Sequence, residues 1–531
     1  MSSRARMWAG LAAAATLLAA PFALAQSGGI ESGLLAELDP WAVGGLGRGD
    51  TALPRTLWGQ TDPVALTTLY DRIPVAPGSP AAARIFRLTL LSPSDAPPGD
   101  AVLAARKRYE TLARLGAADE LVSMVSGSGE AKRDPGIALY ATQADLARGR
   151  LRDACRRAES IQADTPPPFV LRLRALCFAD AGEKESADLA LEIARTSGAG
   201  DPWFQSAVAV MNGAAPARAP LARFDTSLNA EASIAAKLRP PPTNALVNAS
   251  ALALAIVARS ETSPPALRAQ AAWKALRQNA IMPDVARAAG RAEATATAPS
   301  PLGLAVSRVD AASGPYAQAL TIEGALKAAK PHGDFAAMAR LFASDVARLP
   351  IDSGTAPAAV TFTRAMIAVG DYRAAHAWRR IADTVATDAN VLGILDVALT
   401  VSRNDAQNGH FAADRRIETA AARTGGLVTR DLMAMNALDL GIGAAAQDYV
   451  TRNPPAAGRK PDPALMTLLS TAAQRGAVGE TAIYAGMALG DGAETLDAAA
   501  LVQVVAALRS IGLQEAARVI VIEAVIAGQA R

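Results

Sequence analysis

Aromatic, histidine and cysteine residues are scarce in this chain. Of its 531 residues, 4% are aromatic, three are histidine and two are cysteine. None of His332, His376 and His410 stands at a spacing typical of a metal site, and neither a phosphate-binding loop nor a serine nucleophile elbow occurs. The sequence therefore predicts no catalytic and no metal-binding residue, and we expect no cofactor and no enzymatic activity.

An excess of charge of either sign is missing as well. Lys and Arg total 53 and Asp and Glu total 50, which gives a formal net charge of +3. The basic residues are interspersed with acidic ones, so the chain lacks the concentrated positive charge typical of nucleic-acid binding. We expect no nucleic-acid partner.

Long apolar runs are confined to the N-terminus. Arg4 and Arg6 precede an apolar stretch at 8–20, and Ala23-Leu24-Ala25 follows it. This order is typical of an export signal, so we predict a signal peptide over 1–25 that is cleaved after Ala25. An N-terminal membrane anchor is the alternative interpretation. No later apolar run reaches about 18 residues, so no membrane span is expected after cleavage, and the alanine-rich composition favours a bacterial periplasm.

What the chain has in abundance is alanine and helical periodicity. Alanine has the best helix propensity, and no segment shows a sustained alternation of apolar and polar residues. We predict an all-α fold with little or no β-structure. In the first half the predicted helices cover 63–73, 80–92, 100–115, 117–126, 135–148, 150–161, 168–181, 183–197 and 202–212, and helices resume at 244–259 and 265–279.

Glycines recur at the elbows between these predicted helices. Gly116, Gly149 and Gly182 are 33 residues apart, and further elbows are predicted at Gly333, Gly370 and Gly512. A period in the low thirties is the mark of a helix-turn-helix repeat that stacks into a solenoid.

The elbows resemble those of the tetratricopeptide repeat family. The matching residues are the turn glycine and an alanine five positions on, which is Ala154, Ala187, Ala375 or Ala517. The resemblance implies antiparallel helix pairs that stack into a superhelix and bind protein. An irregular all-helical array is the alternative.

Composition divides the chain into segments. After the signal peptide we predict a flexible, glycine-rich arm at 26–61 and a first series of helical repeats at 62–213. A Pro/Ala-rich linker is expected at 214–243. A second helical-repeat region follows at 244–531, with a loose segment near 293–315.

The two cysteines, Cys155 and Cys177, lie on the apolar faces of adjacent predicted helices. With about 1.5 Å of rise per residue, their axial offset across the connection is about 5 Å, so a bridge is geometrically possible. An oxidising compartment favours a disulfide. Two buried free thiols are the alternative.

These observations together favour a non-catalytic, protein-binding scaffold or assembly factor whose partners are proteins of the cell envelope. Candidate partner-binding residues are Trp203, Trp273, Trp378 and Arg379, since exposed aromatic and arginine side chains anchor interfaces. For each of them a place in the core is the alternative. A second hypothesis is a peptidoglycan-associated hydrolase or glycan-binding protein, because Gly512-Leu513-Gln514 resembles a fragment of the lytic transglycosylase pattern.

Overall fold

Aspartate followed by proline begins several of the helices. In the computed structural model, Asp62 accepts hydrogen bonds from the backbone amides of the first turn of its helix, and Asp134 and Asp201 do the same in theirs. These contacts satisfy amides that have no partner within the helix, and proline fits the first turn because its missing N–H is not needed there.

The structure describes residues 39–47, 49–162, 166–215, 219–294, 299–330, 332–385, 388–420 and 425–527. These residues are mainly helical and contain no strand, only one isolated bridge between Arg459 and Leu496. The all-α prediction is therefore confirmed. The predicted signal peptide at 1–25 and residues 26–38 of the predicted arm lie outside the described residues.

The first ten helices lie within two residues of the predicted ranges, apart from the short α5, which the sequence analysis missed. They are α1 (Pro63–Asp71), α2 (Pro80–Leu91), α3 (Val102–Arg114), α4 (Ala118–Gly127), α5 (Gly129–Arg133), α6 (Pro135–Ala147), α7 (Leu151–Ser160), α8 (Pro168–Asp180), α9 (Lys184–Thr196) and α10 (Pro202–Met211).

The middle of the chain contains helices in two segments that were expected to be irregular. It comprises α11 (Ser227–Ala235), α12 (Ala251–Arg259), α13 (Pro265–Arg277), α14 (Pro283–Glu293), α15 (Pro301–Ala311), α16 (Gly314–Ala328) and α17 (His332–Arg348). Helix α11 interrupts the predicted linker at 214–243, and α15 occupies 301–311 of the predicted loose segment at 293–315. Local capping explains both, since Thr226 and Ser300 accept hydrogen bonds from first-turn amides.

The last helices complete the array. They are η1 (Ala356–Ala358), α18 (Ala359–Val369), α19 (Tyr372–Ala382), α20 (Ala389–Arg403), α21 (Gly409–Glu418), α22 (Gly425–Ala437), α23 (Gly443–Arg452), α24 (Pro463–Gln474), α25 (Val478–Leu489), η2 (Ala493–Thr495), α26 (Ala498–Ser510) and α27 (Gln514–Ala527).

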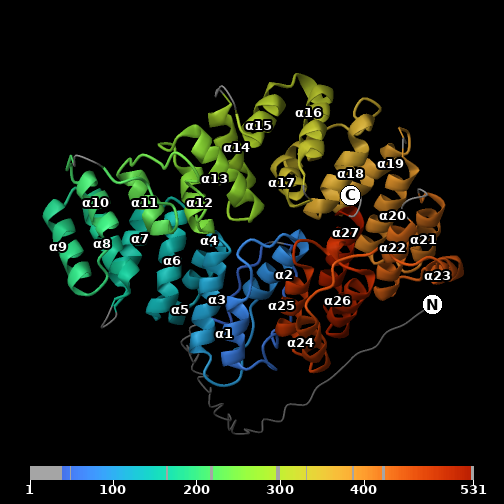
Figure 1. The fold of residues 1–531 in the computed structure, drawn as a ribbon, viewed down its shortest axis with the longest axis horizontal. Helices are drawn as coiled ribbons and strands as arrows, with labels where there is room; N and C mark the ends of the chain where they lie inside the picture. The colour runs from blue at the N-terminus through green and yellow to red at the C-terminus, as the bar shows by residue number, and fades with distance from the viewer. Residues whose placement is uncertain are drawn as a thin grey trace, which may run out of the picture. The chain divides into compact units, whose positions relative to one another are not determined.

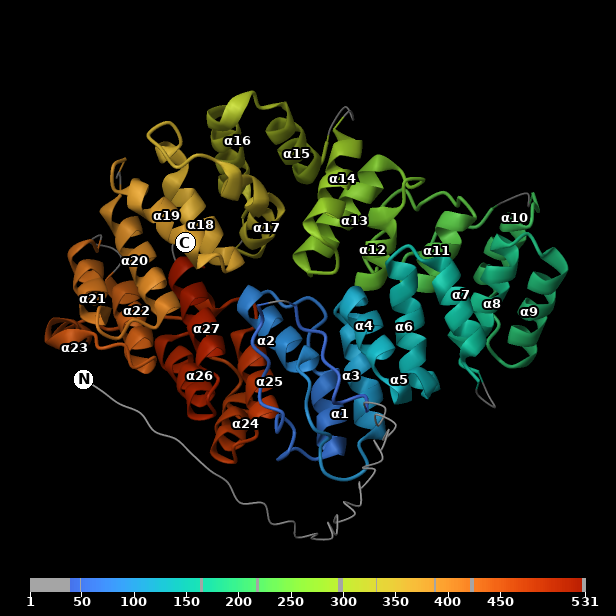
Figure 2. The same cartoon turned by 180° about the vertical axis from the view of Figure 1, so that it is seen from behind.

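Helices that are neighbours in sequence generally pack against each other, as in α8 with α9 and α18 with α19 (Figure 1). Contacts between distant helices are added to this pattern. Helix α12 packs against α3 and α6, and α27 packs against α20 and α22 (Figure 2). The described helices therefore bury their apolar faces both on sequence neighbours and on helices far along the chain.

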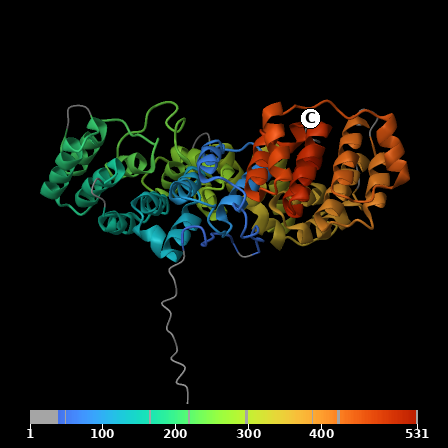
Figure 3. The same ribbon diagram turned by 90° about the horizontal axis from the view of Figure 1, so that it is seen from below.

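Helices from the two ends of the described chain also pack together. Figure 3 shows α1 and α2 in blue beside the red C-terminal helices, and α2 contacts both α25 and α27. Glycines on α25 make this possible, because a Cβ at Gly479 would lie 2.2 Å from the Trp58 ring and one at Gly486 would lie 2.6 Å from the Phe86 ring. We call the contact of Trp58 and Phe86 with α25 the closing seam.

The described part of the predicted flexible arm is packed onto the array, so that prediction is wrong for residues 39–61. Trp41, Leu57 and Trp58 are buried. The fully buried Arg108 on α3 holds the segment by donating to five backbone carbonyl oxygens, those of Pro40, Trp41, Val43, Leu90 and Ser92. Glycine-rich composition suggested mobility, but it instead permits close approach, since a Cβ at Gly44 would lie 2.7 Å from the carbonyl oxygen of Leu91.

Candidate binding surface

Five of the six predicted elbow glycines lie at a left-handed backbone position between consecutive helices. Their φ angles are +74° at Gly116, +72° at Gly149, +78° at Gly182, +81° at Gly370 and +82° at Gly512. Glycine adopts this conformation without the steric cost that a Cβ imposes. These residues set the geometry of the helix pairs and offer no functional group for a ligand.

Gly333 is the exception, and its prediction as an elbow is wrong. It lies in the first turn of α17, which begins at His332. The sequence around it matches an elbow, but α17 already begins one residue before the glycine. The glycine thus occupies a helix start, where the sequence signal of a turn and that of an N-terminus are similar.

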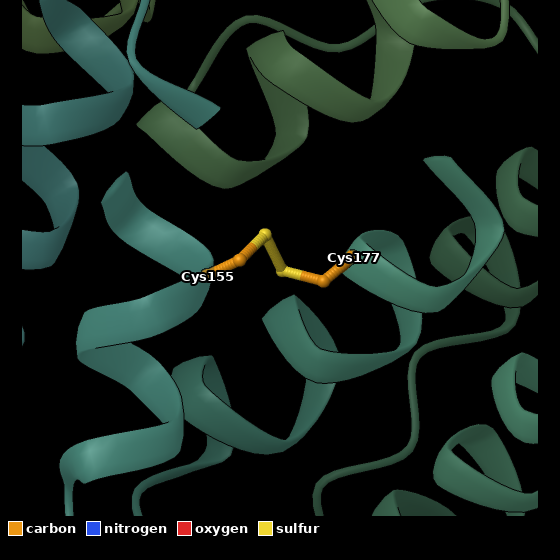
Figure 4. Close-up of a disulfide and its surroundings, with 2 residues drawn as sticks. All are labelled: Cys155 and Cys177. Atoms are coloured by element: carbon orange, nitrogen blue, oxygen red, sulfur yellow. A yellow bond between two sulfur atoms is a disulfide. The ribbon is translucent and has the colours of Figure 1, made fainter. Parts of the chain in front are cut away.

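The structure joins Cys155 and Cys177 in a disulfide between α7 and α8 (Figure 4), with a Cα–Cα distance of 5.8 Å. This separation lies within the usual range for a disulfide. The bond crosslinks α7 to α8, and α8 in turn packs against α9. Its location between two packed helices indicates a stabilising crosslink.

Two of the predicted partner-binding residues are buried and are therefore not available on the surface. Trp378 is in the core and packs edge-on against Phe362, with ring centroids 4.9 Å apart. Arg379 forms ion pairs with Asp383 and Asp396, each at 2.7 Å. The apolar face of α19 carries both residues inward, so the aromatic and the arginine stabilise the array.

The other two tryptophans are partly buried. Trp203 donates from its indole Nε1 to the carbonyl oxygen of Leu221 at 2.8 Å, and the guanidinium of Arg223 lies 5.0 Å from its ring centroid. Trp273 packs against the core from α13. The indole N–H and ring of Trp203 are thus engaged within the chain and Trp273 packs against the core, so these contacts give no support to a role in recognition.

An exposed apolar row on α16, which the sequence analysis missed, is the best candidate for a binding surface. It consists of Tyr316, Leu320, Gly324 and Ala328, and we call it the α16 row. All four are exposed, and a Cβ at Gly324 would meet no atom within 4 Å. Residues spaced by four form one ridge along a helix, so the row presents a continuous apolar surface.

The tyrosine of this row is held in place from one side. Its hydroxyl donates to Asp352 at 3.2 Å, and a Cβ at Gly354 would lie 2.4 Å from its ring. The loop that carries Asp352 and Gly354 therefore fixes the ring, while Leu320 remains 54% exposed one turn further along. A fixed aromatic side chain beside a free leucine is well suited to contact a partner, because little side-chain entropy is lost on binding.

A carboxyl group with altered acidity lies elsewhere, on α11. Burial, together with the like charge of Asp180 at the end of α8, raises the pKa of Glu231 to about 7. A carboxyl group that keeps its proton near neutral pH can act as a general acid. No composition or spacing signal in the sequence singled out Glu231, because its protonation depends on the packing of α11 over α8.

Metal chemistry and membrane crossing find no support in the described residues. No group of three histidine, cysteine or carboxylate side chains among them is placed to hold a metal ion. Within the same ranges, every helix is too short or too polar to cross a membrane. No family profile, curated protein or solved structure matches the chain.

Proposed function

We propose that this chain is a periplasmic protein-binding scaffold or assembly factor that recognises its partner through the α16 row. The observation that carries the proposal is the exposed apolar ridge of Tyr316, Leu320, Gly324 and Ala328. A glycine inside a helix costs about 1 kcal/mol relative to alanine, and here no neighbour within the chain needs the space that Gly324 leaves. The ridge therefore suits close approach by a helix of a partner protein.

The proposed periplasmic location rests on the predicted signal peptide and agrees with the presence of the disulfide. Disulfides persist in oxidising compartments such as the bacterial periplasm. The resemblance of the glycine elbows to tetratricopeptide repeats supports protein binding as well. Protein binding and a partner in the bacterial envelope are both parts of this proposal.

Site-specific photo-crosslinking tests this function. A photoreactive residue placed at Ala317, which is exposed beside Tyr316 and Leu320, is expected to form an adduct of discrete mass in cells that export the protein. Leu320→Asp in the same chain is expected to abolish that adduct without lowering the melting temperature. The matched control is Leu189→Asp on α9, because Leu189 is 63% exposed and lies on a different helix. An adduct that survives Leu320→Asp, or no adduct at all, contradicts the proposal.

A second candidate function, glycan hydrolysis in the cell wall, has one observation in its favour. Glycosidases pair a carboxyl group of raised pKa with a second carboxylate, and the raised pKa of Glu231 owes part of its shift to the like charge of Asp180. Zymography on peptidoglycan distinguishes the two candidates. The enzyme proposal predicts a cleared band that disappears in Glu231→Gln and persists in the control Glu185→Gln on α9. That result would favour a hydrolase over a scaffold.

A further inference from the structure

Four segments that are far apart in the sequence enclose a cavity of about 260 Å³. They are the connection into α2 at 76–83, the connection into α12 at 246–254, the end of α13 at 274–279 and the first turns of α17 at 333–340. Small-molecule sites commonly lie where separately folded elements meet. This cavity exists only because the chain brings α2, α12, α13 and α17 together.

The charged groups that line the cavity are all basic. Lys274, Arg277 and Arg340 contribute to its wall, and the lining includes no aspartate or glutamate. Arg277 is paired with Asp334 at 2.8 Å, just outside the lining. Lys274 and Arg340 have no carboxylate partner among the ion pairs of the described residues, so two positive charges at the wall are left without a counter-charge.

Arg340 is the most deeply placed of these residues. It donates from Nη2 to the carbonyl oxygen of Leu276 at 2.6 Å, whereas its Nε is buried and has no hydrogen-bond partner. Burial, together with the like charge of Arg87, lowers the pKa of Arg340 to about 10, so the guanidinium still carries its charge at neutral pH. A largely buried guanidinium without a carboxylate partner is costly, and an anion bound beside its accessible side would offset that cost.

Two further features of the wall favour an anion. Lys274 Nζ donates to the carbonyl oxygen of Leu246 at 3.0 Å, which fixes the ammonium at the wall and leaves its other two N–H groups for a ligand. Gly333 and Ala336 belong to the first turns of α17, where the partial positive charge of a helix N-terminus lies.

Most of the remaining wall is apolar, and Gln278 and Asn279 are its uncharged polar members. Pro77, Pro80, Val247 and Leu254 line it, and Val247 is 68% exposed. An inorganic ion would leave this surface in contact with water. A ligand with both an anionic head and a short apolar group would contact the basic and the apolar walls at once.

We propose that this cavity binds a small organic anion, with its carboxylate or phosphate head against Arg340 and Lys274 and its apolar group against Val247 and Leu254. This site is separate from the α16 row, and the binding of a small anion does not depend on the proposed scaffold function. A scaffold with such a site would respond to a metabolite or to an envelope component that carries this head group.

Titration calorimetry of the full chain in low-salt buffer tests the site, with hexanoate, hexyl phosphate and the neutral hexanamide as probes. We expect at least one of the two anions to bind about tenfold or more tightly than hexanamide. The anion that binds more tightly identifies the head group as carboxylate or phosphate. Anions that bind no better than hexanamide overturn the proposal.

Variants locate the binding. Arg340→Met is expected to abolish anion binding and Lys274→Met to weaken it about tenfold, whereas Arg156→Met, which removes an exposed arginine on α7, leaves it unchanged. Since Arg340 is partly buried, Lys274→Met serves as the independent test if Arg340→Met does not fold. Anion binding that persists unchanged in Lys274→Met and in any folded Arg340→Met contradicts the assignment to this cavity.

Discussion

The hydroxyl of Ser79 donates a hydrogen bond to the carboxylate of Glu523 at 2.7 Å, although 444 positions separate the two residues in the chain. The same carboxylate accepts from the backbone amides of Ala81 and Ala493. Glu523 on α27 thus caps the start of α2 and joins it to η2. A single buried side chain connects the two ends of the described array beside the closing seam.

The carboxyl group of Glu523 should make stability depend on pH. Burial, partly offset by the hydrogen bonds from Ala493, Ala81 and Ser79, raises its pKa from 4.5 to about 7. The folded state therefore holds the proton more tightly than the unfolded chain. The resulting stabilisation is present below about pH 4.5 and is lost as the pH rises through about 7, which amounts to up to about 3 kcal/mol.

Glu523→Gln should make this dependence weaker, as measured by urea unfolding between pH 5 and pH 8. Glu231, whose pKa is also raised, contributes a slope of the same sign, so the dependence is reduced and not abolished. Glu515→Gln, an exposed position on the same helix, is the control and should keep the wild-type slope. A Glu523→Gln slope equal to that of the wild type would show that the group titrates normally.

Reduction of the Cys155–Cys177 disulfide should destabilise the helices from α7 to α10. The bond closes a loop between residues 22 apart, for which the loss of stability on reduction is roughly 3 kcal/mol. Hydrogen exchange with and without reductant would show faster exchange in these helices and little change in α18–α27. The double variant Cys155→Ser/Cys177→Ser should match the reduced protein and show no response to reductant. Equal protection in both redox states would sink this prediction.

Two elbow glycines with the same backbone conformation should differ in their tolerance of alanine. Gly149→Ala introduces a Cβ into open space, so only the left-handed backbone opposes it, at about 1 kcal/mol. A Cβ at Gly116 would lie 2.5 Å from the Cβ of Ala280 and 2.9 Å from that of Ala251. Gly116→Ala should therefore cost about 3 kcal/mol, since overpacking adds to the backbone term. Denaturant unfolding of both variants checks this, and equal losses would rule out a close contact at Gly116.

Arg108→Met should be among the most destabilising single changes in the N-terminal helices. It removes the donor to the carbonyl oxygens of Val43, Leu90 and Ser92, and each buried group left unsatisfied costs about 1–3 kcal/mol. Limited proteolysis should then cut near 40–60, where the wild type is protected. Arg156→Met, at an exposed arginine, is expected to change stability by less than about 0.5 kcal/mol. Wild-type protection in Arg108→Met would show that the segment is held by other contacts.

The first ten helices could be read from the sequence because their signals are local. Asp62, Asp134 and Asp201 cap α1, α6 and α10, which begin at proline, and the glycines at 116, 149 and 182 follow the ends of α3, α6 and α8. Such signals act within a single turn and need no distant partner. The pairing of Cys155 with Cys177 was likewise accessible, since the two residues lie on helices joined by one short connection.

The candidate surfaces could not be found in this way. Trp378 and Tyr316 are both aromatic residues on helices, yet one is in the core and the other is exposed, and only the packing of neighbouring helices distinguishes them. The misplaced elbow at Gly333 has the same origin, since a glycine followed by an acid fits both a turn and a helix start. Residue type alone therefore predicted Trp378 and Arg379 as partner-binding residues, although both are buried, and it missed the α16 row.

The sequence by itself determined the helical character of this protein, most of its N-terminal helix boundaries and the position of its one possible crosslink. The tertiary structure alone decided that α2 packs on α25 and α27, that α12 lies against α3 and α6, and that basic residues from α13 and α17 share one cavity. The physical reason is that helix formation depends on interactions within a few residues. Which of the alanine-rich helix faces pack against each other depends on their shape. Gly479 and Gly486, for example, leave room on α25 for Trp58 and Phe86.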